Sequence, residues 1–277
     1  MILKRIHLKD EFPFLGENER DPILDVYLPD NISEMGRGDM KHPNMIVCPG
    51  GGYGMCSQRE AEPIALQFLP EGFNVFLLWY SVAPNRFPVQ LREVAAVNEL
   101  ISKYAEEWHC DTSKTAIIGF SAGGHLAAHY STAFDCAEVR EVFPESKPVQ
   151  ASILSYPVIS ADVSVAHIGS FQNLLGKQTL TAEDEDKFSC DRLVNDKTPP
   201  AFLWHTANDA VVPMPNSLLY ANALWKHNIP AELHVYPDGP HGLATSDGYT
   251  NGELREMTKR THRWLADVKE WLKLTLK

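Results

Sequence analysis

One serine of this chain lies in a sequence pattern that is typical of a nucleophile. Ser121 is the centre of Gly119-Phe120-Ser121-Ala122-Gly123, which has the form GxSxG. An apolar run at 115–118 precedes the pattern and a helix-like segment follows it, so the serine falls at a strand-to-helix turn. Glycines beside the serine allow a sharp turn without side-chain clashes. The start of the helix favours negative charge that develops at the serine. The pattern therefore predicts an activated serine.

A serine hydroxyl needs a base to become a good nucleophile. His241 is the best placed of the 11 histidines, because it follows an expected strand at 231–236 on the loop Asp238-Gly239-Pro240-His241-Gly242. Most of the other histidines lie inside expected helices or near the start of an element. We expect the imidazole of His241 to accept the serine proton.

The acid that orients the imidazole is expected between the serine and the histidine along the chain. Asp209 has this place, on the loop after an expected strand at 201–205. Asp162, which follows another strand, is the alternative, and Asp238 is too close to His241 in sequence to be preferred. The order Ser121, Asp209, His241 predicts a catalytic triad.

A run of three glycines, Gly50-Gly51-Gly52, follows an expected strand at 45–48. Consecutive glycines are costly in backbone entropy, but they leave backbone N–H groups open to a ligand. We expect the amides of Gly51, Gly52 and Ala122 to form an oxyanion hole. A phosphate cradle is the weaker alternative, since neither GxxxxGK[ST] nor GxGxxG is present.

Strand-like and helix-like segments alternate along the chain. Alternation of this kind predicts an α/β fold with a mostly parallel sheet and helices on both faces, and ligands bind beyond the carboxyl ends of such strands. The expected strands cover residues 23–28, 45–48, 73–80, 114–119, 151–156, 201–205 and 231–236. The expected helices cover 61–69, 88–109, 122–132, 217–227 and 253–274.

Residues 160–200 interrupt the alternation, because they have little strand character and carry the acidic run Glu183–Asp186. Two interpretations are open: a small cap near the active face, or a solvated loop with a short helix. Residues 1–277 are otherwise expected to form one catalytic domain with this insertion after the strand at 151–156.

Composition excludes several classes of partner. The 277 residues carry a formal net charge of −11, which disfavours nucleic acids and anionic membrane surfaces. The most apolar run, 73–82, is too short to span a bilayer, which takes about 20 residues. The first residues contain no apolar signal segment, and five scattered cysteines fit a reduced, cytoplasmic protein.

The motifs together resemble those of the α/β-hydrolases, in particular the small carbohydrate esterases and the hormone-sensitive-lipase-like carboxylesterases. The resemblance is carried by CPGGGY (48–53), SQREAEPIAL (57–66), YSVAP (80–84), IIGFSAGGHLAAH (117–129), HTANDAVVP (205–213) and GPHGL (239–243). These segments span most of the chain in order. The sequence is most similar to bacterial acetyl esterases assigned to xylan or xylo-oligosaccharide deacetylation.

The resemblance implies that Ser121 is the nucleophile, His241 the base and Asp209 the acid, with a small ester as substrate and no metal or organic cofactor. Pro49 departs from the HGGG pattern of the lipase-like branch, which favours the sugar-esterase branch. A serine peptidase or amidase of the same fold remains the alternative function, and a non-catalytic binding protein of this fold is a further one. The sequence leaves open whether the chain forms a homodimer.

Side chains near the expected strand ends are candidates for contact with a sugar. These are Tyr53, Arg59, Tyr80 and Trp204, although aromatic residues at such places are as often in the core. His125 and His129 share a helix face, but a zinc site would need a third ligand and usually HExxH. We therefore expect both histidines to pack beside the turn at the serine or to meet solvent.

Overall fold

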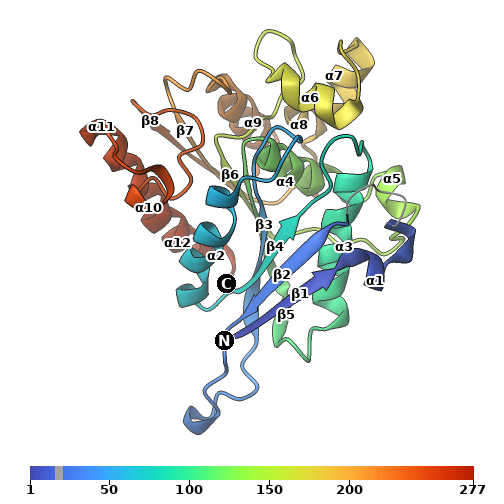
Figure 1. The fold of residues 1–277 in the computed structure, drawn as a ribbon, viewed down its shortest axis with the longest axis vertical. Helices are drawn as coiled ribbons and strands as arrows, with labels where there is room; N and C mark the ends of the chain where they lie inside the picture. The colour runs from blue at the N-terminus through green and yellow to red at the C-terminus, as the bar shows by residue number, and fades with distance from the viewer. Residues whose placement is uncertain (16–20) are drawn as a thin grey trace.

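The computed structural model describes residues 1–15 and 21–277. These residues form an eight-stranded sheet with the order β1-β2-β4-β3-β5-β6-β7-β8, drawn in Figure 1. The strands are β1 (Ile2–His7), β2 (Ile23–Leu28), β3 (His42–Cys48), β4 (Asn74–Trp79), β5 (Cys110–Phe120), β6 (Ala151–Ser155), β7 (Ala201–Thr206) and β8 (Ala231–Tyr236).

The central part of the sheet is parallel, as the alternation of elements predicts. Strands β4, β3, β5, β6, β7 and β8 run parallel to one another, whereas β1 and β2 pair antiparallel at one edge. Parallel strands bring their carboxyl ends to one edge of the sheet, so the loops after β3, β5, β7 and β8 meet there.

Helices cover both faces of the sheet (Figure 1). Helices α3 (Val89–Lys103), α4 (Ala122–Ala133) and α9 (Pro215–Lys226) belong to one hydrophobic core, and α2 (Glu62–Phe68) and α12 (Trp264–Thr275) belong to the other. No helix in the described part of the chain has the length and apolar character that a bilayer crossing requires. The α-helices are α1 (Leu8–Glu11), α2 (Glu62–Phe68), α3 (Val89–Lys103), α4 (Ala122–Ala133), α5 (Ala137–Arg140), α6 (Ile168–Leu175), α7 (Ala182–Phe188), α8 (Cys190–Leu193), α9 (Pro215–Lys226), α10 (Gly248–Asn251), α11 (Glu256–Lys259) and α12 (Trp264–Thr275). Short 3-10 helices are η1 (Pro13–Leu15), η2 (Ser33–Met35), η3 (Gln58–Glu60), η4 (Leu69–Glu71) and η5 (Arg260–Arg263).

All of the strands expected from the sequence are present, and the structure adds one. The additional strand, β1, pairs with β2 at the edge of the sheet. Its sequence, ILKRIH, mixes apolar and basic residues, and none of its side chains is fully buried. An edge strand of this kind lacks the clean alternation by which a strand is predicted.

Two helix predictions are wrong in their extent. The helix expected at 88–109 ends at Lys103, and a turn in which Tyr104 stacks on Trp108 follows it. The helix expected at 253–274 is interrupted, since α11, η5 and α12 replace one continuous element. Met257 in α11 is 48% exposed, whereas Trp264, Leu265, Val268 and Leu272 in α12 are buried.

Residues 160–200 contain three short helices, α6, α7 and α8, rather than the one short helix of the loop interpretation. Thr181 caps α7, because its hydroxyl accepts the N–H of Asp184 and the Asp184 carboxylate accepts the N–H of Thr181. In Figure 1, α6 and α7 project from the end of the molecule at which α4 begins.

Helix α12 supports the loop that carries His241. Trp264, at the start of α12, is fully buried and stacks on Trp204 of β7 with ring centroids 5.1 Å apart. Its indole N–H donates to the carbonyl of Ala244, three residues after His241. The docking of α12 therefore fixes the sheet and the loop together.

We expect Trp264→Ala to lower the free energy of unfolding by about 3–5 kcal/mol, because it leaves a large cavity between α12 and β7. Urea denaturation followed by circular dichroism measures the change. Leu274→Ala on the same helix is the control, since Leu274 is 68% exposed; it should change stability by no more than about 0.5 kcal/mol. Equal effects of the two substitutions would contradict the role given to Trp264.

Candidate active site

Ser121 lies at the turn between β5 and α4, as its motif predicts. The strand ends at Phe120 and the helix begins at Ala122. The backbone of Ser121 has φ 53° and ψ −119°, a conformation that non-glycine residues rarely adopt. This strained turn, the nucleophile elbow, points the hydroxyl away from the sheet.

Two glycines of the motif are required by close backbone packing. A Cβ at Gly119 would lie 2.1 Å from the carbonyl oxygen of Gly123. A Cβ at Gly123 would lie 2.2 Å from the carbonyl oxygens of Cys48 and Pro49. Neither contact can relax by moving a flexible side chain, so the elbow needs glycine at both positions.

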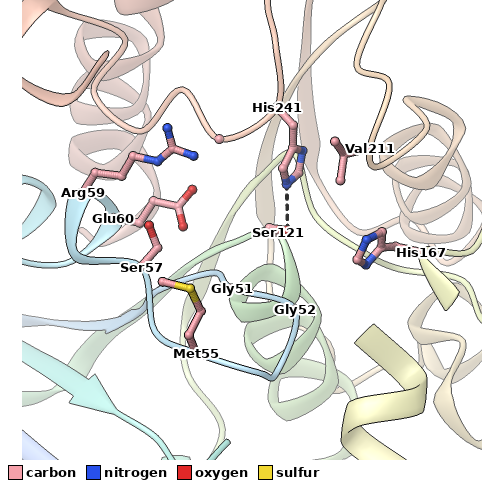
Figure 2. Close-up of a pocket in the computed structure, with 11 residues that line it drawn as sticks. Gly51, Gly52, Met55, Ser57, Arg59, Glu60, Ser121, His167, Val211 and His241 are labelled. Carbon is pink, nitrogen blue, oxygen red and sulfur yellow. Dashed lines mark hydrogen bonds between the residues drawn. The ribbon is translucent and has the colours of Figure 1, made fainter. Parts of the chain in front are cut away.

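The three residues of the predicted triad lie within hydrogen-bonding distance of one another. The Ser121 Oγ is 2.8 Å from Nε2 of His241, and Nδ1 of His241 is 2.7 Å from Oδ2 of Asp209 (the first contact is drawn in Figure 2). The imidazole has an edge-to-face contact with the ring of Tyr156, with centroids 4.9 Å apart. The structure thus brings together side chains from the loops after β5, β7 and β8.

The carboxylate of Asp209 is held in place on both oxygens. Oδ1 accepts the N–H groups of Val211 and Val212, and Oδ2 lies 3.4 Å from Nε2 of His205 as well as near His241. Burial alone would raise the pKa of Asp209, but the interactions with the two histidines outweigh it and hold the pKa well below the ordinary value. Because Asp209 is ionised, Nδ1 of His241 carries the proton, and Nε2 is free to accept from Ser121.

The two alternative acids do not reach His241. Asp162 accepts hydrogen bonds from the N–H and hydroxyl of Ser164. Asp238 accepts from Asn208 and Thr258 and forms an ion pair with Arg255. Both carboxylates have local structural partners, so the geometry favours Asp209.

The glycine loop after β3 lies beside the elbow. Gly51 and Gly52 line the same pocket as Ser121, and Ala122 is the first residue of α4. Within the described residues, the amide N–H groups of Gly51, Gly52 and Ala122 have no hydrogen-bond partner. Three unpaired donors beside a nucleophile are able to stabilise an oxyanion.

A cavity of about 350 Å³ opens over Ser121 and His241. Figure 2 shows Arg59 and His167 on opposite sides of Ser121. Arg59, a candidate for contact with a sugar from the sequence, comes from η3. Gly242 leaves room for its side chain, since a Cβ at Gly242 would lie 2.4 Å from the guanidinium. His167 comes from the insertion at 160–200. Burial of its side chain is the main cause that lowers the pKa of His167, and the nearby His241 lowers it further. The other lining residues are Gly51, Gly52, Met55, Ser57, Glu60 and Val211.

The prediction that Tyr53 and Tyr80 contact the substrate is wrong. Both side chains lie in the core beneath the glycine loop, with exposures of 1% and 3%. The Tyr53 hydroxyl donates to Nδ1 of His125, and the Tyr80 hydroxyl donates to the carbonyl of Pro49. Trp204, also considered for the pocket, is fully buried in β7. Tyr80 therefore supports the glycine loop from within the core, through Pro49.

His125 and His129 pack beside the elbow, the first of the two positions expected for them. Nε2 of His125 donates to the carbonyl of Phe188, and the ring of His129 stacks on Phe87. Burial lowers the pKa of His125 to about 4 and that of His129 to about 3, so both are neutral at pH 7. No group of three or more His, Cys, Asp or Glu that could hold a metal ion occurs among residues 1–15 and 21–277.

Glu60 is a buried carboxylate that the sequence analysis missed. Its Oε2 accepts the N–H of Gly50, and its Oε1 accepts the hydroxyl of Tyr156 at 2.6 Å. The Tyr156 hydroxyl in turn accepts the N–H of Ala244 at 2.9 Å. Burial and the adjacent Glu60 raise the pKa of Tyr156, so it remains a neutral donor. This Glu60–Tyr156 network connects the glycine loop, the end of β6 and the loop of His241.

Comparison with known proteins places the chain among esterase-like proteins. The model of the family described as BD-FAE matches residues 24–224. The chain is 36% identical over 250 residues to endo-1,4-beta-xylanase B of Butyrivibrio fibrisolvens, covering 84% of this chain and 38% of that protein. It is 30% identical over 255 residues to an acetylxylan esterase of Xylanibacter ruminicola, covering 88% of this chain and 49% of that protein. The chain thus spans less than half the length of either curated relative.

Two solved structures match over nearly their whole length. An acetyl ester-xyloside bifunctional hydrolase from Caldicellulosiruptor lactoaceticus is 33% identical, with a TM-score of 0.84 and coverage of 98% of this chain and 96% of that one. A carboxylesterase from Lactobacillus plantarum is 28% identical, with a TM-score of 0.83 and coverage of 99% and 98%. These likenesses confirm the α/β-hydrolase fold expected from the sequence.

Removing the Tyr156 hydroxyl tests the Glu60–Tyr156 network. We expect Tyr156→Phe to lower the free energy of unfolding by about 1–3 kcal/mol, because it leaves a buried carboxylate oxygen and the Ala244 N–H without a partner. Chemical denaturation measures the change.

Tyr220→Phe is the matched control for Tyr156→Phe. Tyr220 is also fully buried, but its hydroxyl has no hydrogen-bond partner within the described residues. Its removal should change stability by no more than about 0.5 kcal/mol. A loss of stability as large as that of Tyr156→Phe would show that the network contributes nothing specific.

Proposed function

The chain belongs to the BD-FAE family, and from this premise we propose that it is a serine-dependent carboxylic ester hydrolase. Its proposed substrates are short-chain acyl esters, acetyl esters first, of xylo-oligosaccharides or related sugars. The observation that carries the proposal is the continuous chain of hydrogen bonds from Ser121 through His241 to Asp209. This arrangement activates a hydroxyl for attack on an acyl carbon.

The reaction begins with acylation of Ser121. The Oγ attacks the acyl carbon while Nε2 of His241 takes its proton, and the ionised Asp209 stabilises the imidazolium that forms. Collapse of the tetrahedral intermediate breaks the bond to the alcohol oxygen, which receives the proton from His241. Water then attacks the acyl-enzyme by the same route, which releases the acid and restores the serine.

The negative charge of each tetrahedral intermediate develops on the former carbonyl oxygen. The unpaired amides of Gly51, Gly52 and Ala122 are the proposed donors to it, and the start of α4 adds a favourable dipole. Loss of one such donor typically costs about 3 kcal/mol in the transition state. The same glycines allow the acyl group to approach the backbone closely.

Several observations support sugar acetates as the substrates. One relative is named an acetylxylan esterase, and a similar solved structure is named an acetyl ester-xyloside bifunctional hydrolase. The side chains that line the pocket include the polar groups of Ser57, Arg59 and His167, which can form hydrogen bonds with a hydroxylated alcohol. All five cysteines are unpaired, which favours a reducing compartment such as the cytoplasm.

We expect Ser121→Ala to reduce kcat for p-nitrophenyl acetate by about 10³–10⁶-fold, since no other group can form the acyl-enzyme. Labelling by a fluorophosphonate probe should disappear in the same variant. Ser131→Ala, on the same helix, is the control, because the Ser131 hydroxyl donates to the carbonyl of Ala127 within that helix. Retained hydrolysis by folded Ser121→Ala would refute the nucleophile, and a preference for aminoacyl-anilides over acetyl esters would favour the amidase alternative.

The role of Asp209 is tested by Asp209→Asn. An amide at this position favours the wrong tautomer of His241, so we expect kcat to fall by about 10⁴-fold with little change in KM. Steady-state kinetics on p-nitrophenyl acetate measures both values. Asp162→Asn is the control, and a larger loss in that variant than in Asp209→Asn would transfer the role to the alternative acid.

A further inference from the structure

A second hollow lies beside the catalytic pocket. Its volume is about 340 Å³, and it is lined by Gln58, Ala61, Glu62, Pro63, Trp79 and Tyr249. None of these residues lines the pocket over Ser121. The hollow is built from η3, the start of α2, the end of β4 and helix α10.

The two cavities share a single wall. Ser57, Arg59 and Glu60 face the catalytic pocket, whereas Gln58, Ala61 and Glu62 face the second hollow. These residues belong to one continuous segment, in which η3 spans Gln58–Glu60. The wall is therefore one short helical turn thick. The same short segment therefore borders both cavities.

The aromatic side chains of the hollow are suited to a flat apolar surface. The indole N–H of Trp79 donates to Asp25, which is itself held by two hydrogen bonds from Arg5, so the ring is fixed. Tyr249 is 75% exposed on α10, and its hydroxyl has no hydrogen-bond partner within the described residues. An aromatic face carries negative charge density, which attracts the C–H groups on one side of a pyranose ring.

The polar groups of the hollow indicate the chemistry of its occupant. Gln58 and Glu62 are both exposed and offer amide and carboxylate groups to hydroxyls. The Glu62 carboxylate and the net charge of −11 disfavour an anionic ligand. A neutral, polyhydroxylated ring that has an apolar face satisfies both the aromatic and the polar groups.

We propose that this hollow, which we call the Trp79–Tyr249 subsite, binds a sugar unit of an oligosaccharide whose acetylated unit lies at Ser121. The inference rests on the proposed function and adds to it a place, outside the pocket over Ser121, at which a second sugar unit is bound. Binding energy gained at a remote unit orients the ester at the serine, so the subsite raises the specificity constant for longer substrates.

The first test compares two substrates in the same preparations. We expect Tyr249→Ala to lower kcat/KM for acetylated xylotetraose about tenfold relative to kcat/KM for p-nitrophenyl acetate, which carries no sugar unit. Tyr249→Phe keeps the ring and should restore the wild-type ratio. Trp225→Ala is the control, because Trp225 is a 46% exposed aromatic residue on α9 that does not line the subsite.

An unchanged ratio in Tyr249→Ala would overturn the proposal, and so would an equal loss on both substrates, which indicates a general structural effect. A wild-type protein that hydrolyses neither ester would refute the proposed function instead.

The second test is independent of catalysis. Binding of unacetylated xylotetraose to Ser121→Ala is measured by calorimetry and by the change in tryptophan fluorescence. We expect binding to weaken about tenfold when Tyr249→Ala is added, and to recover with Tyr249→Phe. Binding that is insensitive to Tyr249, or no binding at all, would contradict the subsite even where acetyl esters are hydrolysed.

Discussion

The packing of backbone against backbone at the nucleophile elbow is the constraint on which the rest of the site depends. At Gly123, the first turn of α4 touches the carbonyl oxygens of Cys48 and Pro49, and at Gly119, β5 touches the carbonyl of Gly123. These contacts bring the elbow and the glycine loop together without any intervening side chain. The position of the serine relative to the amides of Gly51 and Gly52 is therefore set by the main chain, and side-chain motion hardly affects it.

The histidine arrives from a separate loop, and its position depends on side chains. The Glu60–Tyr156 network connects that loop to the glycine loop through three consecutive hydrogen bonds, and the indole of Trp264 holds the same loop through Ala244. The base is thus fixed by groups that do not react. An α/β-hydrolase site needs such support, because a displacement of about 1 Å from a productive geometry can cost a factor of 10² in rate.

The sequence allowed the fold and the triad to be predicted because their signals are local. A GxSxG turn after an apolar run, and an aspartate and a histidine directly after strands, carry their information within a few residues. The network of Glu60 and Tyr156 could not be predicted in this way, since it depends on the pairing of three segments that are distant along the chain. Tyr156 directly follows β6 at the carboxyl edge of the sheet, so its position indicated that it lies near the site. Nothing in the sequence identified Glu60 as its hydrogen-bond partner. Tyr53 and Tyr80 show the converse error, because nearness to a strand end does not determine whether a side chain points into the pocket or beneath it.

The residues that hold the triad and the residues that form the pocket walls come from different parts of the fold. The parallel strands present short, closely packed loops that hold Ser121, Asp209 and His241, and these loops tolerate little change. The pocket walls come instead from η3, from the insertion at 160–200 through His167, and from the residues just after His241. These segments lie at the rim of the sheet rather than in its core, so they can differ among relatives without disturbing the triad. The walls of the pocket can therefore change while the contacts among Ser121, Asp209 and His241 are kept.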